Sequence, residues 1–351
     1  MKIPEAYSAL RRVKHGNSDI VSMGFVRGVS INESKVSVVF LFPEELRGKE
    51  RPILDEARKS LEAEGAESVD FQVNFAILSE KKSIKDMSKK PIPGVKNVVL
   101  ITSGKGGVGK STVAANLAAE LALRGLPVGL FDADVYGPSV PTLMGIQSAE
   151  IRAENNKIIP VEAYRVKVMS LGLMLEEDSP VIWRGPLVHK AYEQLLFETA
   201  WGALDFLILD LPPGTGDAQL SMAQLVEITG GIVVTTPQAI AINDVRRALA
   251  MLRKVNVPAI GIVETMSYYR CPGCGREEAL FGQGGGESLS RETGVPLLAR
   301  VPFDPDLVAA SDAGIPIVVA KPGSEAAKAF GSLAEEVVRY VEKRKTKSAV
   351  E

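Results

Sequence analysis

Beyond residue 95, short runs of apolar residues alternate with longer segments whose apolar residues recur at helical spacing. The short runs predict strands at 97–102, 127–131, 205–209, 230–235, 257–263 and 297–301. The longer segments predict helices near 111–124, 187–200, 217–226, 241–255, 284–293, 304–312 and 324–343. Strands that are apolar at nearly every position belong to parallel sheets covered by helices on both faces. The fold class is therefore α/β, with a mostly parallel, doubly wound sheet whose ligands bind at the carboxyl ends of the strands.

Residues 1–82 follow a different pattern, which predicts a separate small α+β module. Its expected elements are a hairpin, a helix and a closing strand, at 19–42, 51–64 and 68–76. Residues 83–94 are polar, basic and proline-containing, as is typical of a linker. The main domain is then 95–344, with a small hairpin expected within 150–175 and a flexible tail at 345–351.

Composition is that of an ordinary soluble globular protein, with 46% hydrophobic and 24% charged residues. The formal net charge is −2, and no long basic run precedes the last ten residues, so charge does not indicate a nucleic-acid partner. No apolar run reaches the roughly 18 residues of a membrane span, and the N-terminus has no apolar signal-peptide core. We therefore expect a cytoplasmic protein whose partners include neither nucleic acid nor membrane.

The segment Gly104-Lys-Gly-Gly-Val-Gly-Lys-Ser111 matches the phosphate-loop pattern G-x-x-x-x-G-K-[ST] at every fixed position, between a predicted strand and a predicted helix. Such a P-loop surrounds phosphates with backbone N–H groups, and the helix adds its positive N-terminal end. Lys110 would reach the β and γ phosphates of ATP, and Ser111 would join the Mg²⁺ shell. The alternative is a glycine-rich turn without a ligand. The candidate nucleotide-binding residues of this loop are Gly104, Lys105, Gly106, Gly107, Val108, Gly109, Lys110, Ser111 and Thr112.

Two acidic residues follow the predicted strand at 127–131. Asp132 and Asp134 stand where carboxylates hold Mg²⁺ waters or orient an attacking water. The alternative for one of them is capping of a helix that begins near Pro138.

A third acid, Asp210, ends the buried run at 205–209 in the Walker B arrangement and would contact Mg²⁺ through a water. The loop from Leu211 to Asp217 follows directly and contains two prolines and two glycines. Its backbone N–H groups are expected to register the γ-phosphate. Three phosphate-site elements at three strand ends, in the proper order, indicate a P-loop NTPase.

Lys105 directly follows the first glycine of the phosphate loop. The run K-G-G-V-G-K-[ST] resembles the deviant Walker A motif of the MinD, ParA and nitrogenase iron-protein class. That resemblance implies that Lys105 crosses a dimer interface to the nucleotide of the partner subunit; the alternative is a solvated loop lysine. A homodimer would then complete the nucleotide site, with Lys105, Lys110 and Asp134 as candidate catalytic residues.

Cys271 and Cys274 stand in the motif Cys-Pro-Gly-Cys and are the only cysteines of the chain. Two thiolates leave a tetrahedral zinc site or a Cys₄ iron–sulfur site half complete, and the only histidines are His15 and His189. Two chains that each donate a cysteine pair would complete such a site. The alternatives are a redox dithiol or two cysteines without function, and thiolate ligands alone do not separate Zn²⁺ from a cluster.

Residues 95 to about 340 resemble the Mrp/ApbC family of iron–sulfur cluster carrier ATPases. The runs that carry this resemblance are 102–112, 132–139, 183–188, 210–217, 266–274, 281–287 and 294–297. It implies that the phosphate loop binds ATP, that the three aspartates serve Mg²⁺ and water, and that Cys271 and Cys274 carry a bridging [4Fe–4S] cluster. The implied function is a dimeric carrier that delivers clusters to apo iron–sulfur proteins, with slow ATP hydrolysis as a switch.

The chain departs from the family pattern in two places. Thr265 replaces an asparagine that usually helps to hold the base, and residues 1–80 lack the cysteine often present in the preceding module. Two other functions stay open. A partitioning or positioning ATPase of the ParA/MinD type would leave the cysteine pair without a role, and neither an amphipathic terminal helix nor a basic DNA-binding face is apparent. A zinc-bridged structural dimer would use the cysteine pair without any transfer.

Overall fold

The computed structural model describes residues 3–16, 18–32, 35–76, 89–135, 137–155, 157–174, 185–214 and 216–348. The chain divides into two compact units, Met1–Asp86 and Met87–Glu351. Residues 83–88 of the expected linker lie outside the described part, whereas Lys90 pairs with Val226 of the larger unit.

The smaller unit is a three-stranded sheet with two helices on one face. Its strands lie in the order β3 (Val26–Asn32), β4 (Lys35–Pro43), β5 (Ser68–Ala76). β3 is antiparallel to β4, and β5 is parallel to it. Alternate residues of β4 are buried against α1 (Ile3–Leu10) and α2 (Arg51–Ala63), which is why this strand shows a period of two. The unit also contains β1 (Lys14–His15), β2 (Ser18–Asp19) and the 3₁₀ turn η1 (Glu44–Leu46).

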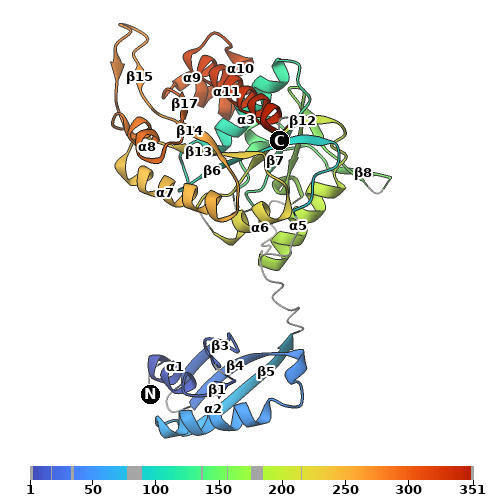
Figure 1. Ribbon diagram of the computed structural model, residues 1–351, viewed down its shortest axis with the longest axis vertical. Helices are drawn as coiled ribbons and strands as arrows, with labels where there is room; N and C mark the ends of the chain where they lie inside the picture. The colour runs from blue at the N-terminus through green and yellow to red at the C-terminus, as the bar shows by residue number, and fades with distance from the viewer. Residues whose placement is uncertain are drawn as a thin grey trace. The chain divides into compact units, whose positions relative to one another are not determined.

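The larger unit is built on one eight-stranded sheet in the order β10-β11-β7-β12-β6-β13-β14-β17 (Figure 1). Every neighbouring pair is parallel except β10 and β11. In that order the strands are Val161–Ala163, Val166–Ser170, Val128–Asp132, Leu204–Asp210, Val95–Ser103, Gly230–Thr235, Ala259–Glu264 and Leu297–Arg300.

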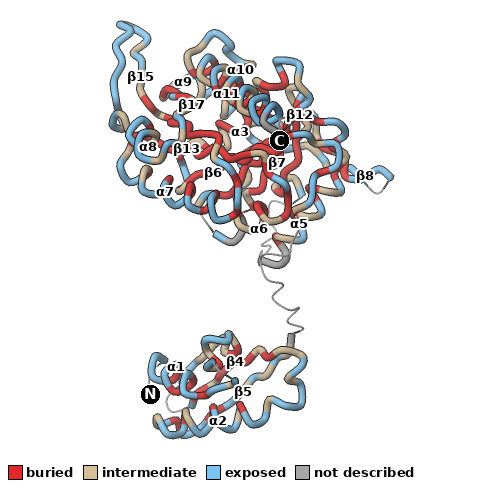
Figure 2. Tube along the Cα trace, viewed as in Figure 1, coloured by how far each residue is buried: buried red, intermediate tan, exposed pale blue. Residues whose placement is uncertain are grey.

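Helices cover both faces of this sheet, and a separate hydrophobic cluster lies on each face. One face packs against α3 (Lys110–Leu123), α4 (Val140–Leu143), α9 (Pro305–Asp312), α10 (Ile317–Ala320) and α11 (Glu325–Ser348). The other packs against α5 (Gly185–Glu198), α6 (Asp217–Leu225), α7 (Ala239–Lys254) and α8 (Gly285–Thr293). Buried residues accordingly concentrate along the central strands (Figure 2). The predicted α/β class with a mostly parallel, doubly wound sheet is confirmed.

The region 150–175 contains more sheet than the single hairpin expected there. β8 (Arg152–Glu154) and β9 (Lys157–Ile159) form a hairpin, and β11 then joins the central sheet parallel to β7, ahead of the 3₁₀ turn η2 (Leu171–Met174). The apolar run of β11 is interrupted by Lys167, whose Nζ donates to the carbonyl of Trp201 at 2.9 Å. That interruption hides the strand from a search for continuous apolar runs.

At the C-terminus, helix α11 continues into the segment 345–351, as far as Ser348. Among the described residues, no helix is long and apolar enough to cross a membrane.

Candidate functional site

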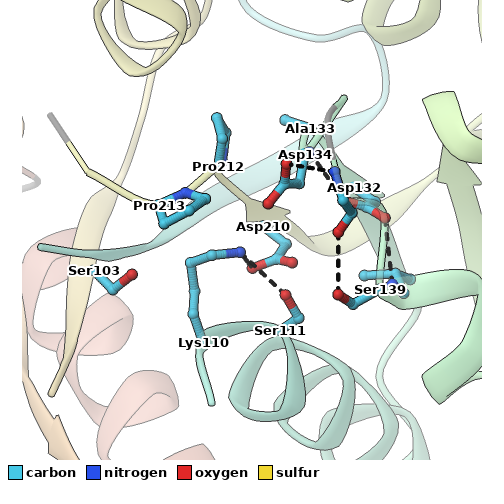
Figure 3. Close-up of polar contacts among 12 residues, drawn as sticks. Ser103, Lys110, Ser111, Asp132, Ala133, Asp134, Ser139, Asp210, Pro212 and Pro213 are labelled. Carbon is cyan, nitrogen blue, oxygen red and sulfur yellow. Dashed lines mark hydrogen bonds and ion pairs between the residues drawn. The ribbon is translucent and has the colours of Figure 1, made fainter. Parts of the chain in front are cut away.

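The carboxyl ends of β6, β7 and β12 lie side by side and form the centre of the candidate site (Figure 3). Strand register places Asp210 of β12 beside Asp132 of β7 and beside Ile101 of β6. The phosphate loop follows β6 and leads directly into α3. The fold therefore brings together the loop and the acidic strand ends that the sequence identified separately.

The phosphate loop has the backbone geometry of an anion-binding turn. Gly107 and Gly109 have φ angles of 75° and 78°, in the left-handed region where other residues are strained. Gly109 is the N-cap of α3, and no side chain caps this helix end. The first N–H groups of α3 are therefore left for a ligand, and the helix dipole favours an anion there.

Lys110 reaches from the first turn of α3 into the centre of the site (Figure 3). Its Nζ donates to Asp210 Oδ1 at 2.6 Å and to Ser111 Oγ at 3.1 Å. The side chains of Lys110 and Asp210 are only 7% and 0% exposed. Asp210 Oδ2 is buried and has no hydrogen-bond partner among the described residues. An orphaned carboxylate oxygen close to a serine hydroxyl fits Mg²⁺, which takes oxygen ligands, so Asp210 and Ser111 would hold this ion directly or through water.

Burial sets the protonation of both aspartates. It raises the pKa of Asp210, and the Lys110 ammonium opposes that rise. Burial, and after it the charge of Asp210, raises the pKa of Asp132 to about 7. Two buried carboxylates beside one ammonium do not ionise together easily. A divalent cation would relieve this repulsion because its charge is the largest in such a site.

Asp132 organises the loop that follows β7. Its Oδ1 accepts from the Asp134 N–H at 3.0 Å, and its Oδ2 accepts from Ser170 Oγ at 3.0 Å and from the Val140 N–H at 3.3 Å. Val140 is the first residue of α4, so its contact with Asp132 is of the kind that the capping alternative expects. Asp134 Oδ1 accepts in turn from the Gly137 N–H at 3.2 Å. Both aspartates stand at the predicted strand end, and their roles with Mg²⁺ and water stay predictions.

Lys105 is half-buried within its own chain. Its Nζ lies 3.4 Å from Gln238 Oε1, beside the start of α7, and its carbonyl accepts from Ser103 Oγ at 2.9 Å. The predicted reach to a partner subunit would exchange the long contact with Gln238 for a nucleotide phosphate.

The loop after β12 is tied to the end of β6, directly before the phosphate loop. The Gly214 N–H donates to the Ser103 carbonyl at 3.0 Å, and Gln219 Nε2 donates to the carbonyls of Pro212 and Pro213 at 2.8 and 3.0 Å. The N–H of Gly214 is thus committed to Ser103 rather than turned toward a γ-phosphate. Thr215, in the middle of this predicted sensor loop, lies outside the described residues.

A cavity of about 190 Å³ opens beside the N-terminus of α3. Thr112, Met266, Phe303 and Leu307 contribute to its largely apolar lining, which suits a nucleotide base. Thr265 also borders this cavity, but its Oγ1 lies 2.6 Å from the Val108 carbonyl and 2.9 Å from the Thr235 carbonyl. The hydroxyl has one proton and donates it to the backbone, so Thr265 braces the phosphate loop instead of presenting an amide to a base.

The cysteine pair lies on a short hairpin of β15 (Tyr269–Arg270) and β16 (Glu277–Glu278), which projects from the larger unit (Figure 1). The Cys271 N–H donates to the Arg276 carbonyl at 2.9 Å, and the Gly275 N–H donates to the Cys271 carbonyl at 2.8 Å. The backbone N–H of Cys274, followed by that of Gly273, holds the pKa of the Cys271 thiol below its usual value. Cys271 is half-buried and Cys274 is exposed.

This hairpin offers a metal two thiolates, from Cys271 and Cys274. Across the part of the chain that the structure describes, no group of three or more His, Cys, Asp or Glu side chains could hold a metal ion.

Comparison with known proteins identifies the family. Residues 94–338 match the model of the NUBPL iron-transfer P-loop NTPases, within the ParA group. The chain belongs to this NUBPL family. It is 50% identical over 259 residues to the iron–sulfur cluster carrier protein of Aquifex aeolicus, covering 73% of this chain and 71% of that protein. It is 37% identical over 345 residues to the iron–sulfur cluster carrier protein of Helicobacter pylori, covering 97% and 93%.

Solved structures agree with this NUBPL-family assignment. The nucleotide-binding protein of Archaeoglobus fulgidus, in complex with ADP, has a TM-score of 0.58 and 38% identity, covering 64% of this chain and 88% of that one. The cell division ATPase MinD of Pyrococcus furiosus has a TM-score of 0.51 and 27% identity, covering 69% and 98%. The resemblance to cluster carriers of the ParA/MinD-like class, predicted from the motifs, is confirmed.

Sequence reasoning missed the cavity and the buried Glu264 near it. The segment Val301-Pro-Phe-Asp-Pro305 follows the last strand at the ligand-binding edge of the sheet, and its two prolines were the available signal for a shaped loop. Trp183 and Arg184, from one of the runs that resemble the family, lie outside the described residues.

Proposed function

We propose that this NUBPL-family chain is an ATP-binding carrier that holds an iron–sulfur cluster between two copies and passes it to apo iron–sulfur proteins. The observation that carries the proposal is the turn around Cys271 and Cys274. Backbone N–H groups favour the Cys271 thiolate, and the pair stands on a projecting hairpin. Thiolates bind cluster iron, and an exposed site allows an acceptor to reach it. The names of the relatives, cluster carrier proteins, support the same cargo.

A homodimer follows from the number of ligands. One chain supplies two thiolates, and a [4Fe–4S] cargo takes four. Two hairpins related by a two-fold axis would present four sulfurs to one cluster. Lys105 at the rim of the phosphate loop would cross the same interface.

The nucleotide is the switch in this proposal. ATP binds in the phosphate loop, and Lys110 leaves Asp210 for the β and γ phosphates. Mg²⁺, when bound by Ser111 and Asp210, neutralises phosphate charge. Asp134 orients the attacking water, and Lys105 of the partner subunit stabilises the charge that develops on the phosphates. The ATP and ADP states then differ at Lys110, at Asp210 and in the loop from Leu211 to Asp217.

Anaerobic reconstitution with iron and sulfide tests the cargo. We expect an absorption spectrum of an iron–sulfur cluster, about four irons per dimer, and transfer of that iron to an apo iron–sulfur protein. Cys274→Ala should lose the iron and keep ATP binding, because the phosphate loop lies at a different strand end.

Arg276→Ala is the matched control, since Arg276 stands in the same turn with its side chain 73% exposed and offers no metal ligand. It should retain the iron of the wild type. Full iron retention in Cys274→Ala, four irons on a proven monomer, or zinc as the only metal bound would each contradict the proposal.

A further inference from the structure

Glu264 is a buried carboxylate to which the proposed chemistry gives no role. It is the last residue of β14, and its side chain is only 2% exposed. Its Oε2 accepts from the Gly286 N–H at 2.6 Å, in the first turn of α8. Its Oε1 accepts from Ser267 Oγ at 2.5 Å and lies 3.9 Å from Nε of Arg300 on β17. A buried carboxylate is costly unless it is compensated, so these contacts fix one arrangement of three elements.

The fit around Glu264 is close and specific. A Cβ at Gly286 would lie 2.9 Å from Glu264 Oε2, so only glycine lets the backbone of α8 approach this far. Ser267 uses its hydroxyl twice: it donates to Glu264, and it accepts from Nε of Arg300 at 2.9 Å. Arg300 also lies 3.7 Å from the exposed Glu287.

This cluster holds the segment that joins the nucleotide side of the molecule to the cysteine hairpin. The segment begins at Thr265, which is bonded to the phosphate-loop carbonyl of Val108. It continues through Ser267, whose N–H donates to the Val301 carbonyl at 3.0 Å, and enters β15 at Tyr269. In Figure 1, β14, β17 and α8 gather at the base of the β15 hairpin.

Between the two anchored residues, Met266 has a φ of 51°, an unfavourable value for a side chain of this kind. Met266 also lines the cavity beside α3. Strain of this kind persists only where the surroundings impose it. A nucleotide base in the cavity would press on Met266, and Ser267, held by Glu264, would carry that displacement into the hairpin.

We infer that Glu264 is a positioning residue that couples nucleotide occupancy to the geometry of Cys271 and Cys274. The inference rests on the proposed function, because it concerns how firmly the cysteine pair holds its cargo. With Glu264 in place, the nucleotide-bound and nucleotide-free protein hold the hairpin in different positions and therefore release iron at different rates. Without its charge, the hairpin moves independently of the nucleotide.

The experiment compares iron release from the reconstituted full-length protein to a coloured chelator, without nucleotide or with saturating ADP. We expect wild-type rates to differ by about fivefold or more between the nucleotide-free and the ADP-bound protein, the lower end of typical coupling between two sites. Glu264→Gln should bring this ratio below about two, as substitutions within a coupled network do. Its iron content and nucleotide affinity should stay within about twofold of wild type, because Glu264 touches neither ligand.

Glu287→Gln is the matched control, since it removes the exposed carboxylate beside Arg300 and should keep the wild-type ratio. Ser267→Ala, which deletes the shared hydroxyl alone, should reduce the ratio as Glu264→Gln does, and it serves as the test if Glu264→Gln does not fold. A wild-type ratio near one overturns the coupling, as does a ratio unchanged in either variant. Failure of the carrier proposal would be visible separately, as absence of iron from the wild-type protein.

Discussion

At the scale of single residues, Lys110 and Asp210 link nucleotide binding to stability. Each charge is buried and compensated by the other at 2.6 Å. Removal of one member of such a pair leaves an uncompensated buried charge and typically costs about 3–5 kcal/mol. A simple loss of ATP binding in a Lys110 variant could therefore arise from unfolding, and a second substitution is needed to separate the two effects.

Lys110→Ala should weaken ATP binding at least about 100-fold, or about 2.7 kcal/mol, and should lower the melting temperature. Adding Asp210→Asn to it should restore most of the stability, because the orphaned charge is gone, without restoring ATP affinity. Calorimetric titration and thermal unfolding on both variants test this. Recovered ATP affinity in the stable double variant would show that Lys110 does not contact phosphate.

The raised pKa of Asp132 predicts how the stability of the nucleotide-free protein depends on pH. Its native pKa is about 7, against an ordinary value of 3.8. Between these values the native carboxyl keeps a proton that the unfolded chain has released, so the free energy of unfolding falls as pH rises from about 4 to about 7. Asp132→Asn removes this titration.

Melting temperatures of the nucleotide-free protein measured from pH 5 to pH 8 test the assignment. The wild type should lose at least about 2 °C more over this range than Asp132→Asn, which corresponds to about 1 kcal/mol in a domain of this size. Parallel curves for the two proteins would place the titration elsewhere.

At the scale of secondary-structure elements, the β15–β16 turn should make Cys271 reactive at unusually low pH. The N–H groups of Cys274 and Gly273 lower the pKa of its thiol, and alkylation follows the thiolate. In Cys274→Ser, the rate of iodoacetamide labelling should reach half its maximum at a lower pH than in the same protein unfolded in urea. Coincident profiles for the folded and unfolded states would mean that the turn does not stabilise the thiolate.

Strands and helices were predictable from the sequence where the local pattern of apolar residues determines them. The continuous apolar runs of β6, β12 and β13 are buried on both faces, and only a strand in the middle of a sheet requires that. β11 was missed because Lys167 sends its ammonium to the Trp201 carbonyl, a contact between distant segments.

The residues of the candidate site likewise fall into two groups: those predictable from local sequence and those whose contacts depend on the fold. Spacing within one segment identified the phosphate loop and the cysteine pair. The partners of Asp132, the brace at Thr265 and the cluster around Glu264 depend on residues from other elements, such as Ser170 and Gly286. A local pattern places an acidic residue at the end of a buried strand but does not indicate which residues of other elements it will contact, so those contacts required the fold.

At the scale of the whole molecule, the proposed carrier is a dimer whose two nucleotide sites and one cluster site share an interface. Lys105 is the residue that would report on it, because within its own chain the Nζ of Lys105 makes a long contact of 3.4 Å with Gln238 Oε1. A contact made only when the γ-phosphate is present shifts the dimer toward one geometry by its differential affinity.

Small-angle scattering of the full-length dimer, with ADP or with a non-hydrolysable ATP analogue, tests this arrangement. We expect two distinct profiles, with the more compact one for the ATP analogue. Lys105→Ala should keep nucleotide affinity within about threefold, since Lys110 still binds the phosphates, but should give the ADP-like profile with both nucleotides. Lys96→Ala, at the opposite end of β6 in an exposed ion pair with Asp205, is the control for loss of a surface lysine and should behave as wild type. Identical wild-type profiles at saturating concentrations of both nucleotides would mean that the γ-phosphate does not change the dimer, and the switch would then have to act within each chain.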